Sequence, residues 1–446
     1  MQKSSKVFVM LSAKLLSRCK KIFQIALPSG MSSFLDIFNI SIALLFVGKL
    51  STSHIVAFGV GMNFVMLFYT ITAIFFTGTN ATIARLHTQI LERKIALATL
   101  SFYSLLISIP LFFLAIFTQT PYLTWMGGSK ESIILSSEFL DILVFALPPL
   151  LLKTTLTSAF SAISKANIPF YVKTFCTFFN IGANYLLIFG KFGFPRLELY
   201  GAGIANLLSI LLEALLLSIL AKKYFGIIFK IDFSYFKLAL KIGIPTGIER
   251  AFTLFSLVMI SKFLIGYGDE ILAGFQIGGR IEAFAFMPGF GFMIASMTLM
   301  GQNIKRLKRG KAYVYLTLYL SSFFMGILGI LMCFFGNTLS LVFSSNPLVI
   351  EYSHAYLIAV GISQIPLITI FVLDGALRGL GASKISLFIN ASSIWGLRII
   401  PMYLCTHFHL SAYYIFGIIC LETFIRAGIF WWVFDREKFT KSIVKI

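Results

Sequence analysis

A few acidic side chains lie inside long apolar stretches, and they are the residues of this chain whose chemistry first needs an explanation. If the stretches cross a membrane, each carboxylate costs at least about 2.5 to 3.5 kcal/mol, so each is a candidate for function. Burial favours the neutral form of a carboxylate, which lets it take up and release a proton, whereas a nearby arginine favours the charged form. The acids in such stretches are Asp36, Glu138, Asp141, Glu213, Glu249, Glu282, Asp374 and Glu422.

The composition indicates that these stretches do cross a membrane. Of the 446 residues, 58% are hydrophobic and only 12% are charged, whereas soluble domains have about 25% charged residues. Apolar runs of about 20 residues, the length that spans a hydrocarbon core, recur along the chain. They start near residues 22, 55, 95, 133, 168, 200, 238, 271, 312, 354, 385 and 412. The predicted fold is an all-α polytopic membrane protein with 12 transmembrane helices.

The net charge of +20 could indicate a nucleic-acid binder, so the placement of the basic residues decides its meaning. Loops on the side of the N-terminus hold 26 of the 37 Lys and Arg residues, and the opposite side holds about five. This bias follows the positive-inside rule and predicts that both termini are cytoplasmic in the cell (inner) membrane. The basic stretch at 305–311 then lies near anionic membrane lipids, and we expect no nucleic-acid partner.

Two parts of the chain repeat each other at one constant offset, which places Pro245 opposite Pro28. The segment QIALPSGM at 24–31 matches KIGIPTGI at 241–248, and SAFSAISKANIP at 158–169 matches GALRGLGASKIS at 375–386. Six spans per half predict two six-helix bundles related by a pseudo-two-fold axis along the membrane normal. The predicted domains are a cytoplasmic N-terminal segment at 1–21, an N-terminal lobe at 22–221, a cytoplasmic linker at 222–237, a C-terminal lobe at 238–434 and a cytoplasmic tail at 435–446.

Motifs of ATP-driven and enzymatic chemistry are absent from the sequence. It has no P-loop, no GxGxxG after a strand and no HExxH, and its five cysteines and five histidines form no metal-binding pattern. We therefore expect a protein that is not an enzyme and that binds neither a cofactor nor a structural metal. A channel is also not favoured, because no filter-like loop is evident.

The most specific motifs are MPGFGF at 287–292 and LMGQN at 299–303, within the stretch 241–303. Together with GALRGLGAS at 375–383 and WGLRIIP at 395–401, they resemble the multidrug and toxic compound extrusion (MATE) family, and the resemblance covers nearly the whole chain. It implies a V-shaped cavity between two bundles and export of cationic organic compounds or amphipathic drugs in exchange for H⁺ or Na⁺, by rocking between inward-open and outward-open states. We expect a monomer among membrane lipids. A lipid-linked oligosaccharide flippase of the same superfamily is the alternative.

One part of the family pattern is changed in this chain. The family keeps an acid fifteen residues after the proline of the first span, a second acid four residues after an asparagine in span five, and a threonine in span six. Those three positions hold Ala43, Asn184 and Asn206 here, and the asparagine is Asn180. The three amides can bind a substrate through hydrogen bonds, but they do not titrate near pH 7 and should hold Na⁺ weakly.

Asp36 offers a replacement for the missing acid. It lies eight residues after Pro28, about 10 Å deeper toward the cytoplasm than the family's acid on nearly the same helix face. The repeat offset places its counterpart at Thr253, one helical turn beyond Glu249. If these faces line the central cavity, Asp36 and Glu249 form a pair of carboxylates across the substrate path. A hydrogen bond to a neighbouring helix is the structural alternative for Asp36.

Several acids have basic residues of the spans as alternative partners. Glu249, near the middle of the seventh span, could bind Arg250, Arg280 or a neighbouring backbone group. Glu282 lies two residues from Arg280, which is not same-face spacing, and Glu213 has no partner in its own helix. The basic residues in the spans are Lys153, Lys173, Arg250, Arg280, Arg398 and Arg426.

Two acids precede an arginine by one helical turn. Asp374 with Arg378, and Glu422 with Arg426, therefore predict i,i+4 ion pairs. An ion-pair role and an ion-coupling role both remain open for Asp374. The candidate residues for substrate binding or ion coupling are Asp36, Asn180, Asn184, Asn206, Glu249, Glu282 and Asp374.

Three prolines are candidates for hinges in the spans. Pro28 and Pro245 lie early in their spans, and Pro288 lies in mid-span between glycines. Proline removes a backbone hydrogen bond of the helix, so each of these sites predicts either a fixed kink or a moving hinge.

Overall fold

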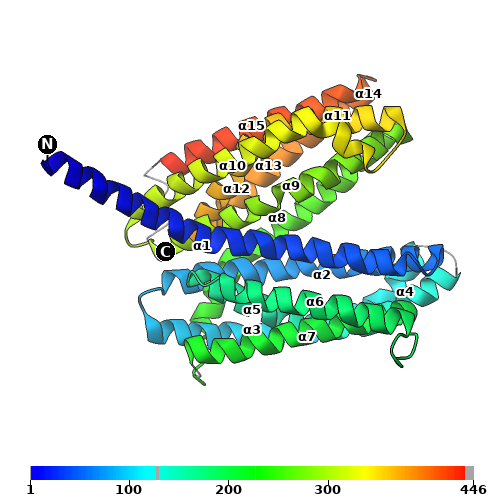
Figure 1. Ribbon diagram of the computed structural model, residues 1–446, viewed down its shortest axis with the longest axis horizontal. Helices are drawn as coiled ribbons and strands as arrows, with labels where there is room; N and C mark the ends of the chain where they lie inside the picture. Colours follow the sequence, from blue (N-terminus) through cyan, green and yellow to red (C-terminus); the bar gives the residue numbers. More distant parts are fainter. Residues whose placement is uncertain (1, 127–129, 227, 437–446) are drawn as a thin grey trace. The chain divides into compact units, whose positions relative to one another are not determined.

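The computed structural model describes residues 2–126, 130–226 and 228–436, with the side chains of all of these except 2–14 and 52. Most of the predicted C-terminal tail, 437–446, lies outside the described residues. Within the described ranges the chain is built of helices, and no strand occurs (Figure 1). The all-α prediction is therefore confirmed.

The helices follow one another with short connections. Their bounds are α1 Gln2–Val47, α2 Thr52–Arg85, α3 Ile90–Met126, α4 Lys130–Leu143, α5 Leu147–Ala162, α6 Asn167–Phe189, α7 Glu198–Phe225, α8 Phe233–Ile265, α9 Asp269–Gln302, α10 Leu307–Leu341, α11 Pro347–Ile362, α12 Gln364–Gly379, α13 Ser383–Ser392, α14 Ile400–His407 and α15 Ala412–Asp435. A 3₁₀ turn at Val144–Ala146 joins α4 to α5, and a π-helical segment at Ser393–Ile399 joins α13 to α14.

The helices supply the predicted membrane spans. In the described chain, ten helical stretches are long and apolar enough to cross a membrane, and α11 with α12 forms an eleventh that is bent by 54°. The helix α8 is not among these eleven, but its 33 residues make about 50 Å of helix, which is long enough to be the twelfth segment. These twelve segments begin close to the twelve predicted starts, so the polytopic prediction is confirmed.

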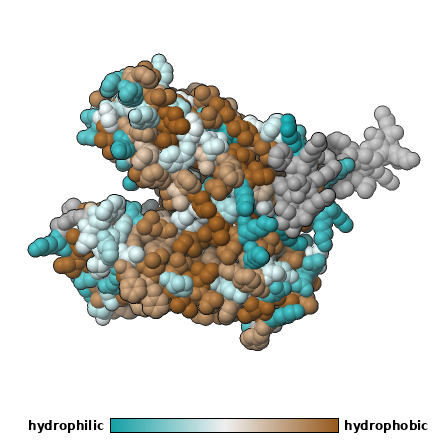
Figure 2. Space-filling view, turned by 180° about the vertical axis from the view of Figure 1, so that it is seen from behind, coloured by the Kyte–Doolittle hydropathy of each residue, from teal (hydrophilic) through white to brown (hydrophobic). Residues whose placement is uncertain are grey.

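Large apolar side chains are exposed along these helices. Figure 2 shows them, in brown, over much of one face of the molecule. Phe117 of α3 and Phe334 of α10, for example, are more than 70% exposed. A surface of this kind is too apolar for water and matches the hydrocarbon of a bilayer.

Two compact units make up the chain, and each has its own hydrophobic core. One unit is Met31–Gly247, and the other is Met1–Gly30 together with Ile248–Ile446. The divisions fall inside the continuous helices α1 and α8, after two glycines that the sequence repeat places opposite each other. The lobes predicted from the sequence repeat, 22–221 and 238–434, stay a prediction. The compact units differ from them by the exchange of the segments that begin α1 and α8.

The exchanged start of α1 packs against α9 with almost no space between the helices. A Cβ atom added to Gly291 would lie 1.9 Å from the carbonyl oxygen of Ala26, and one added to Gly30 would lie 3.1 Å from Cα of Pro288. Small residues of this kind let two helix backbones approach closely in a membrane. The start of α8 packs in the same way in the other unit, where a Cβ on Gly243 would lie 2.2 Å from the carbonyl oxygen of Ile74.

The three prolines predicted as hinges lie inside long helices: Pro28 in α1, Pro245 in α8 and Pro288 in α9. Pro28 and Pro245 each come two residues before the glycine at which their helix passes from one unit to the other. Their role as moving hinges stays a prediction.

We expect Gly291→Ala to lower the free energy of unfolding by about 1 to 3 kcal/mol, because the added methyl group meets a backbone atom that can move only with its helix. Chemical denaturation of the detergent-solubilised protein measures this value. Gly279→Ala on the same helix is the matched control, because a Cβ there meets no atom within 4 Å. Removing a helical glycine should stabilise that variant by about 0.5 to 1 kcal/mol. Equal effects of the two substitutions would contradict the tight contact between α1 and α9.

Both ends of the predicted linker at 222–237 are helical, because they belong to α7 and α8. α7 runs to Phe225 and α8 begins at Phe233, so the described non-helical part is short. The carboxylate of Asp232 caps α8, because its Oδ1 accepts a hydrogen bond of 2.9 Å from the backbone N–H of Ser234. Hydrogen bonds from Ser234 hold the pKa of Asp232 below its usual value. The cap therefore stays ionised at neutral pH.

Candidate functional site

Three of the charged residues meet inside the unit that contains Ile248–Ile446. Glu249 lies on α8, and Asp374 and Arg378 lie one turn apart on α12. Nη2 of Arg378 lies 2.9 Å from Oε1 of Glu249 and 2.5 Å from Oδ2 of Asp374, and its Nε donates to Oδ1 of Asp374 at 3.0 Å. Asp374 and Arg378 are buried, and the side chain of Glu249 is 13% exposed. One guanidinium thus binds two carboxylates from two different helices.

Hydrogen bonds and ion pairs continue from Glu249 to α13 and α15. Nδ2 of Asn390 donates to Oε1 of Glu249 at 2.9 Å, and Nη1 of Arg426 donates to Oδ1 of Asn390 at 3.5 Å. Glu422 pairs with Arg426 at 3.1 Å and with Arg398 at 2.5 Å. We call these seven residues the charge network: Glu249, Asp374, Arg378, Asn390, Arg398, Glu422 and Arg426. It contains three acids and three arginines, so its formal charge is zero.

The π-helical segment Ser393–Ile399 positions Arg398 for this network. Nε and Nη2 of Arg398 both donate to Oε2 of Glu422. The indole of Trp395 in the same segment stacks on the ring of Phe255 on α8, with ring centroids 5.5 Å apart. π-helical turns are rare in proteins, and those that do occur often lie at functional sites.

Both predicted i,i+4 pairs are confirmed, because Asp374 binds Arg378 and Glu422 binds Arg426. Arg250 and Arg280, the arginines predicted as possible partners of Glu249, do not bind it; its partners are Arg378 and Asn390. Adjacent residues of a helix point about 100° apart, so Arg250 is directed away from Glu249 and is exposed. Arg280 is exposed as well.

Glu282 has a different kind of partner. It lies on α9, and its Oε2 accepts a hydrogen bond of 2.5 Å from the hydroxyl of Tyr356 on α11. Among the described residues, no Lys or Arg nitrogen lies within 4.0 Å of its carboxylate. The charge of Arg398 acts on Glu282 from farther away, while its guanidinium is bound to Glu422. Glu282 is therefore a carboxylate held by a neutral hydroxyl.

The unit Met31–Gly247 contains two further ion pairs between helices. Oδ2 of Asp36 on α1 lies 2.5 Å from Nζ of Lys173 on α6, so Asp36 does bind a neighbouring helix, and its role stays a prediction. Oε2 of Glu213 on α7 lies 2.6 Å from Nζ of Lys153 on α5. The two acids differ in burial, because the side chain of Asp36 is 57% exposed and that of Glu213 is 8% exposed.

The three predicted amides lie where α6 and α7 meet. Nδ2 of Asn184 donates to Oδ1 of Asn180 at 2.7 Å, and Nδ2 of Asn180 donates to the carbonyl oxygen of Ala205 at 3.1 Å. Oδ1 of Asn184 is buried and has no hydrogen-bond partner among the described residues. Asn206, which follows Ala205 on α7, lines a small cavity of about 20 Å³.

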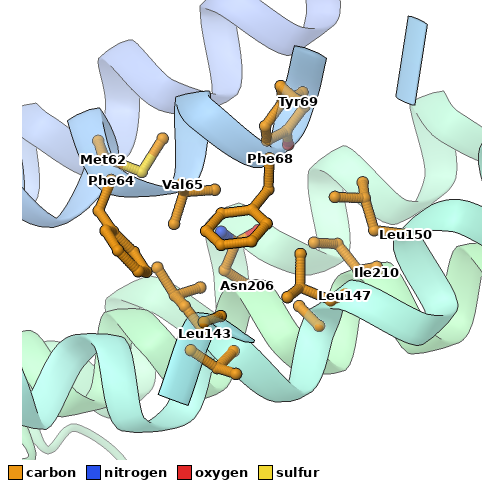
Figure 3. A pocket seen from close by; sticks show the side chains of 13 residues that line it. Met62, Phe64, Val65, Phe68, Tyr69, Leu143, Leu147, Leu150, Asn206 and Ile210 are labelled. Carbon is orange, nitrogen blue, oxygen red and sulfur yellow. The ribbon is translucent and has the colours of Figure 1, made fainter. Parts of the chain in front are cut away.

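Aromatic and aliphatic side chains form the rest of that cavity. Figure 3 shows the ring of Phe68 and the side chains of Asn206, Leu147 and Ile210 around it, with Tyr69 at its edge. A cavity of this volume holds about one water molecule. The amide of Asn206 is thus a polar group at an otherwise largely apolar cavity.

Comparison with known protein families identifies the family of this chain. The model of the MatE family matches the chain twice, at residues 28–186 and 245–404. This chain belongs to the MatE family. The two matches begin at the equivalent prolines and reproduce the offset of the sequence repeat, so they confirm the duplication. MatE membership and the apolar helices together show a multi-pass membrane protein.

Individual MatE relatives agree with this assignment. The chain is 32% identical to the probable multidrug resistance protein NorM of Thermotoga maritima over 238 residues, which are 52% of this chain and 51% of that protein. It is 24% identical to the probable multidrug resistance protein NorM of Neisseria meningitidis over 65% of each chain. The matches thus span about half to two thirds of these relatives. They do not favour the flippase alternative.

Solved MatE-type structures share the fold over the whole chain. The MATE transporter VcmN of Vibrio cholerae in its bent form has a TM-score of 0.89 at 16% identity, covering 97% of this chain and 99% of that one. A MOP superfamily transporter from Pyrococcus furiosus has a TM-score of 0.85 at 15% identity, covering 96% and 97%. At these identities the likeness establishes the fold alone.

Asn390 and Tyr356, the neutral partners of Glu249 and Glu282, were not among the predicted site residues. Each lies on a different helix from its acid and far from it along the chain, so no local spacing could have indicated the contact. The basic partners Lys153, Lys173 and Arg398 were recognised as charges within spans, but their acids could not be assigned.

Proposed function

We propose that this chain is a secondary active efflux transporter that exports cationic or amphipathic organic compounds in exchange for protons. Membership of the MatE family supports a transport function, and the relatives from Thermotoga and Neisseria are probable multidrug resistance proteins. The observation that carries the choice of proton is the pairing of Glu282 with a tyrosine hydroxyl. We further propose that both termini are cytoplasmic, in an inner membrane, and that the chain acts as a monomer.

Glu282 is the candidate for proton coupling because its charge is not held by an ion pair. Five other span acids each have a Lys or Arg nitrogen within 3.1 Å; they are Asp36, Glu213, Glu249, Asp374 and Glu422. The remaining two, Glu138 and Asp141 on α4, are exposed, and Asp141 accepts a hydrogen bond of 2.7 Å from the amide of Gln119. A bound guanidinium or ammonium favours the ionised form of an acid, whereas a phenol adds no charge that opposes its protonation. A tyrosine hydroxyl can donate or accept. The hydrogen bond between Tyr356 and Glu282 can therefore persist in both protonation states.

The same contacts support H⁺ over Na⁺ as the coupling ion. A hard cation needs several oxygen ligands around it. For Glu282 the structure shows one such oxygen, the hydroxyl of Tyr356. At Glu249 a guanidinium already lies where a cation would bind. A single proton on Glu282 requires no further ligand.

Asp36 is the proposed contact for a cationic substrate. An ionised group in a span that is 57% exposed must border a water-filled path, because exposure to lipid would be too costly. The partner shown for Asp36 is the ammonium of Lys173. A substrate ammonium can compete with Lys173 for this carboxylate. Whether Asp36 and Glu249 lie across one path from each other stays a prediction.

Transport in proteoliposomes tests the proposal. We expect the wild-type protein to drive uptake of ethidium into liposomes with an acidic lumen, and a Na⁺ gradient to be without effect. Glu282→Gln should abolish this pH-driven uptake, because the amide keeps a hydrogen bond to Tyr356 but cannot take up a proton. Exchange of labelled for unlabelled ethidium, without a gradient, should continue in this variant.

Glu351→Gln is the matched control for that experiment. Glu351 accepts a hydrogen bond of 2.6 Å from the hydroxyl of Tyr413, which is the same chemical pair at an exposed position. Its pH-driven uptake should equal the wild-type rate. Normal uptake by Glu282→Gln would refute the coupling role of Glu282, and uptake driven by Na⁺ would refute H⁺ coupling. If the wild-type protein moves no organic cation under either gradient, the transport proposal is wrong.

A further inference from the structure

A basic pocket lies where α1 meets the first turns of α10. Its volume is about 470 Å³, and its lining residues are Ser17, Arg18, Lys21, Lys308, Arg309, Ala312 and Tyr313. Four of the seven are basic and none is acidic. All seven belong to the unit that combines Met1–Gly30 with Ile248–Ile446.

The positive charge of this pocket is not neutralised by the described part of the chain. No described carboxylate lies within 4.0 Å of the charged nitrogens of Arg18, Lys21, Lys308 or Arg309. α10 also starts here, with no acidic residue in its first turn and no side-chain cap from Arg306. The amino end of a helix carries partial positive charge and favours an anion. Side chains and helix dipole therefore attract an anion to the same place.

Arg18 is held in position within the pocket. Its guanidinium lies over the ring of Tyr313, 5.6 Å from the ring centroid, and Tyr313 itself is buried. A stacked arginine keeps its donors directed to one side and loses less freedom when it binds an anion. The pocket thus has one ordered basic side chain, that of Arg18, and three further basic side chains around it.

The pocket lies at the end of membrane-spanning helices, next to exposed apolar residues. The candidate span on α10 begins at Leu307, so the pocket lies beside the first turn of that span. Leu15 and Leu16 are exposed beside Ser17 and Arg18. An anion that is bound here and carries acyl chains could place them along such residues. Basic pockets between spans on the cytoplasmic side of a membrane, where we propose that the N-terminus lies, suit the head groups of anionic lipids.

We propose that this basic pocket binds the phosphate head group of an anionic phospholipid. The phosphate lies between Arg18 and the pair Lys308 and Arg309, at the amino end of α10, and the acyl chains lie along the apolar surface of the spans. The proposal is independent of the transport function and of the coupling role of Glu282.

Binding of fluorescent phosphatidylglycerol to the purified full chain in neutral detergent tests this site. We expect saturable binding to the wild-type protein and none of phosphatidylcholine. The double variant Lys308→Gln with Arg309→Gln should bind about thirtyfold more weakly, because two of the four basic residues are lost. Lys222→Gln with Lys223→Gln is the matched control, since these two exposed lysines at the end of α7 are not among the lining residues of the pocket. It should bind like the wild type.

A neutral substitution separates the pocket from surface charge in general. Ala312→Phe fills part of the pocket and changes no charge, so it should weaken binding of phosphatidylglycerol as well. Equal binding by wild type, the Lys308/Arg309 variant and the Lys222/Lys223 variant would overturn the proposal, and so would normal binding by Ala312→Phe. Inorganic phosphate is the competitor that identifies the source of the anion. Competition by phosphate at the same concentration as the lipid would show a soluble anion site and refute the lipid assignment.

Discussion

Arg378→Met is expected to lower the free energy of unfolding by about 3 to 5 kcal/mol, which is among the largest effects of any single substitution in this chain. The guanidinium of Arg378 binds both Glu249 and Asp374; Arg378 and Asp374 are buried, and the side chain of Glu249 is only 13% exposed. Methionine fills similar space but leaves two carboxylates without their counter-charge. Denaturant unfolding of the detergent-solubilised protein, followed by tryptophan fluorescence, measures the change.

Two further variants determine whether the loss comes from the unpaired acids. Arg280→Met is the matched control, because Arg280 is exposed and should change stability by less than about 0.5 kcal/mol. Adding Asp374→Asn to Arg378→Met should recover part of the loss, because one of the two unpaired charges is removed. A loss below about 1 kcal/mol in Arg378→Met, or no recovery in the double variant, would contradict the arrangement of the network.

Lys153→Met is expected to have a comparable effect in the other unit, again about 3 to 5 kcal/mol. Its ammonium lies 2.6 Å from Glu213, whose side chain is only 8% exposed. Without Lys153, the carboxylate of Glu213 stays buried beside apolar residues of α7. Thermal unfolding at neutral pH should show a clearly lower midpoint, and Glu213→Gln in the same chain should restore much of it.

Lys173→Met provides the comparison for Lys153→Met. Lys173 makes an ion pair of similar length, but its partner Asp36 is 57% exposed. Solvent can stabilise that carboxylate when the lysine is removed, so the expected loss is below about 1 kcal/mol. Similar losses in the two lysine variants would show that Asp36 does not reach water and would weaken its proposed role in substrate binding.

Local spacing predicted those contacts that lie within one helix. Asp374 with Arg378 and Glu422 with Arg426 are four residues apart, and both pairs form. The geometry of an α-helix places such residues on one face whatever surrounds the helix. Contacts between helices had no comparable signal. Arg378 binds Glu249 across 129 positions of the chain, and only the tertiary fold brings these two side chains together.

The repeat shows the same limit at a larger scale. The sequence contains the constant offset between its halves and the equivalent prolines Pro28 and Pro245, and the two family matches reproduce them. It does not show that the starts of α1 and α8 pack in exchanged units. That exchange depends on the fit of Gly291 to Ala26 and of Gly243 to Ile74, which involves atoms of helices that are distant in sequence.

The sequence by itself determined the twelve spans, the duplication and the family, because hydrophobic length, charge bias and motif spacing are local properties of the chain. It also identified the acids that membrane burial makes costly. Only the tertiary structure decided which of those acids are paired with a basic side chain. Five are bound by lysine or arginine, Glu282 is bound by Tyr356, and the two exposed acids of α4, Glu138 and Asp141, have no Lys or Arg nitrogen within 4.0 Å in the described part of the chain. The ionisation of a carboxylate depends on the atoms within a few ångströms of it, and in this fold those atoms come mostly from other helices.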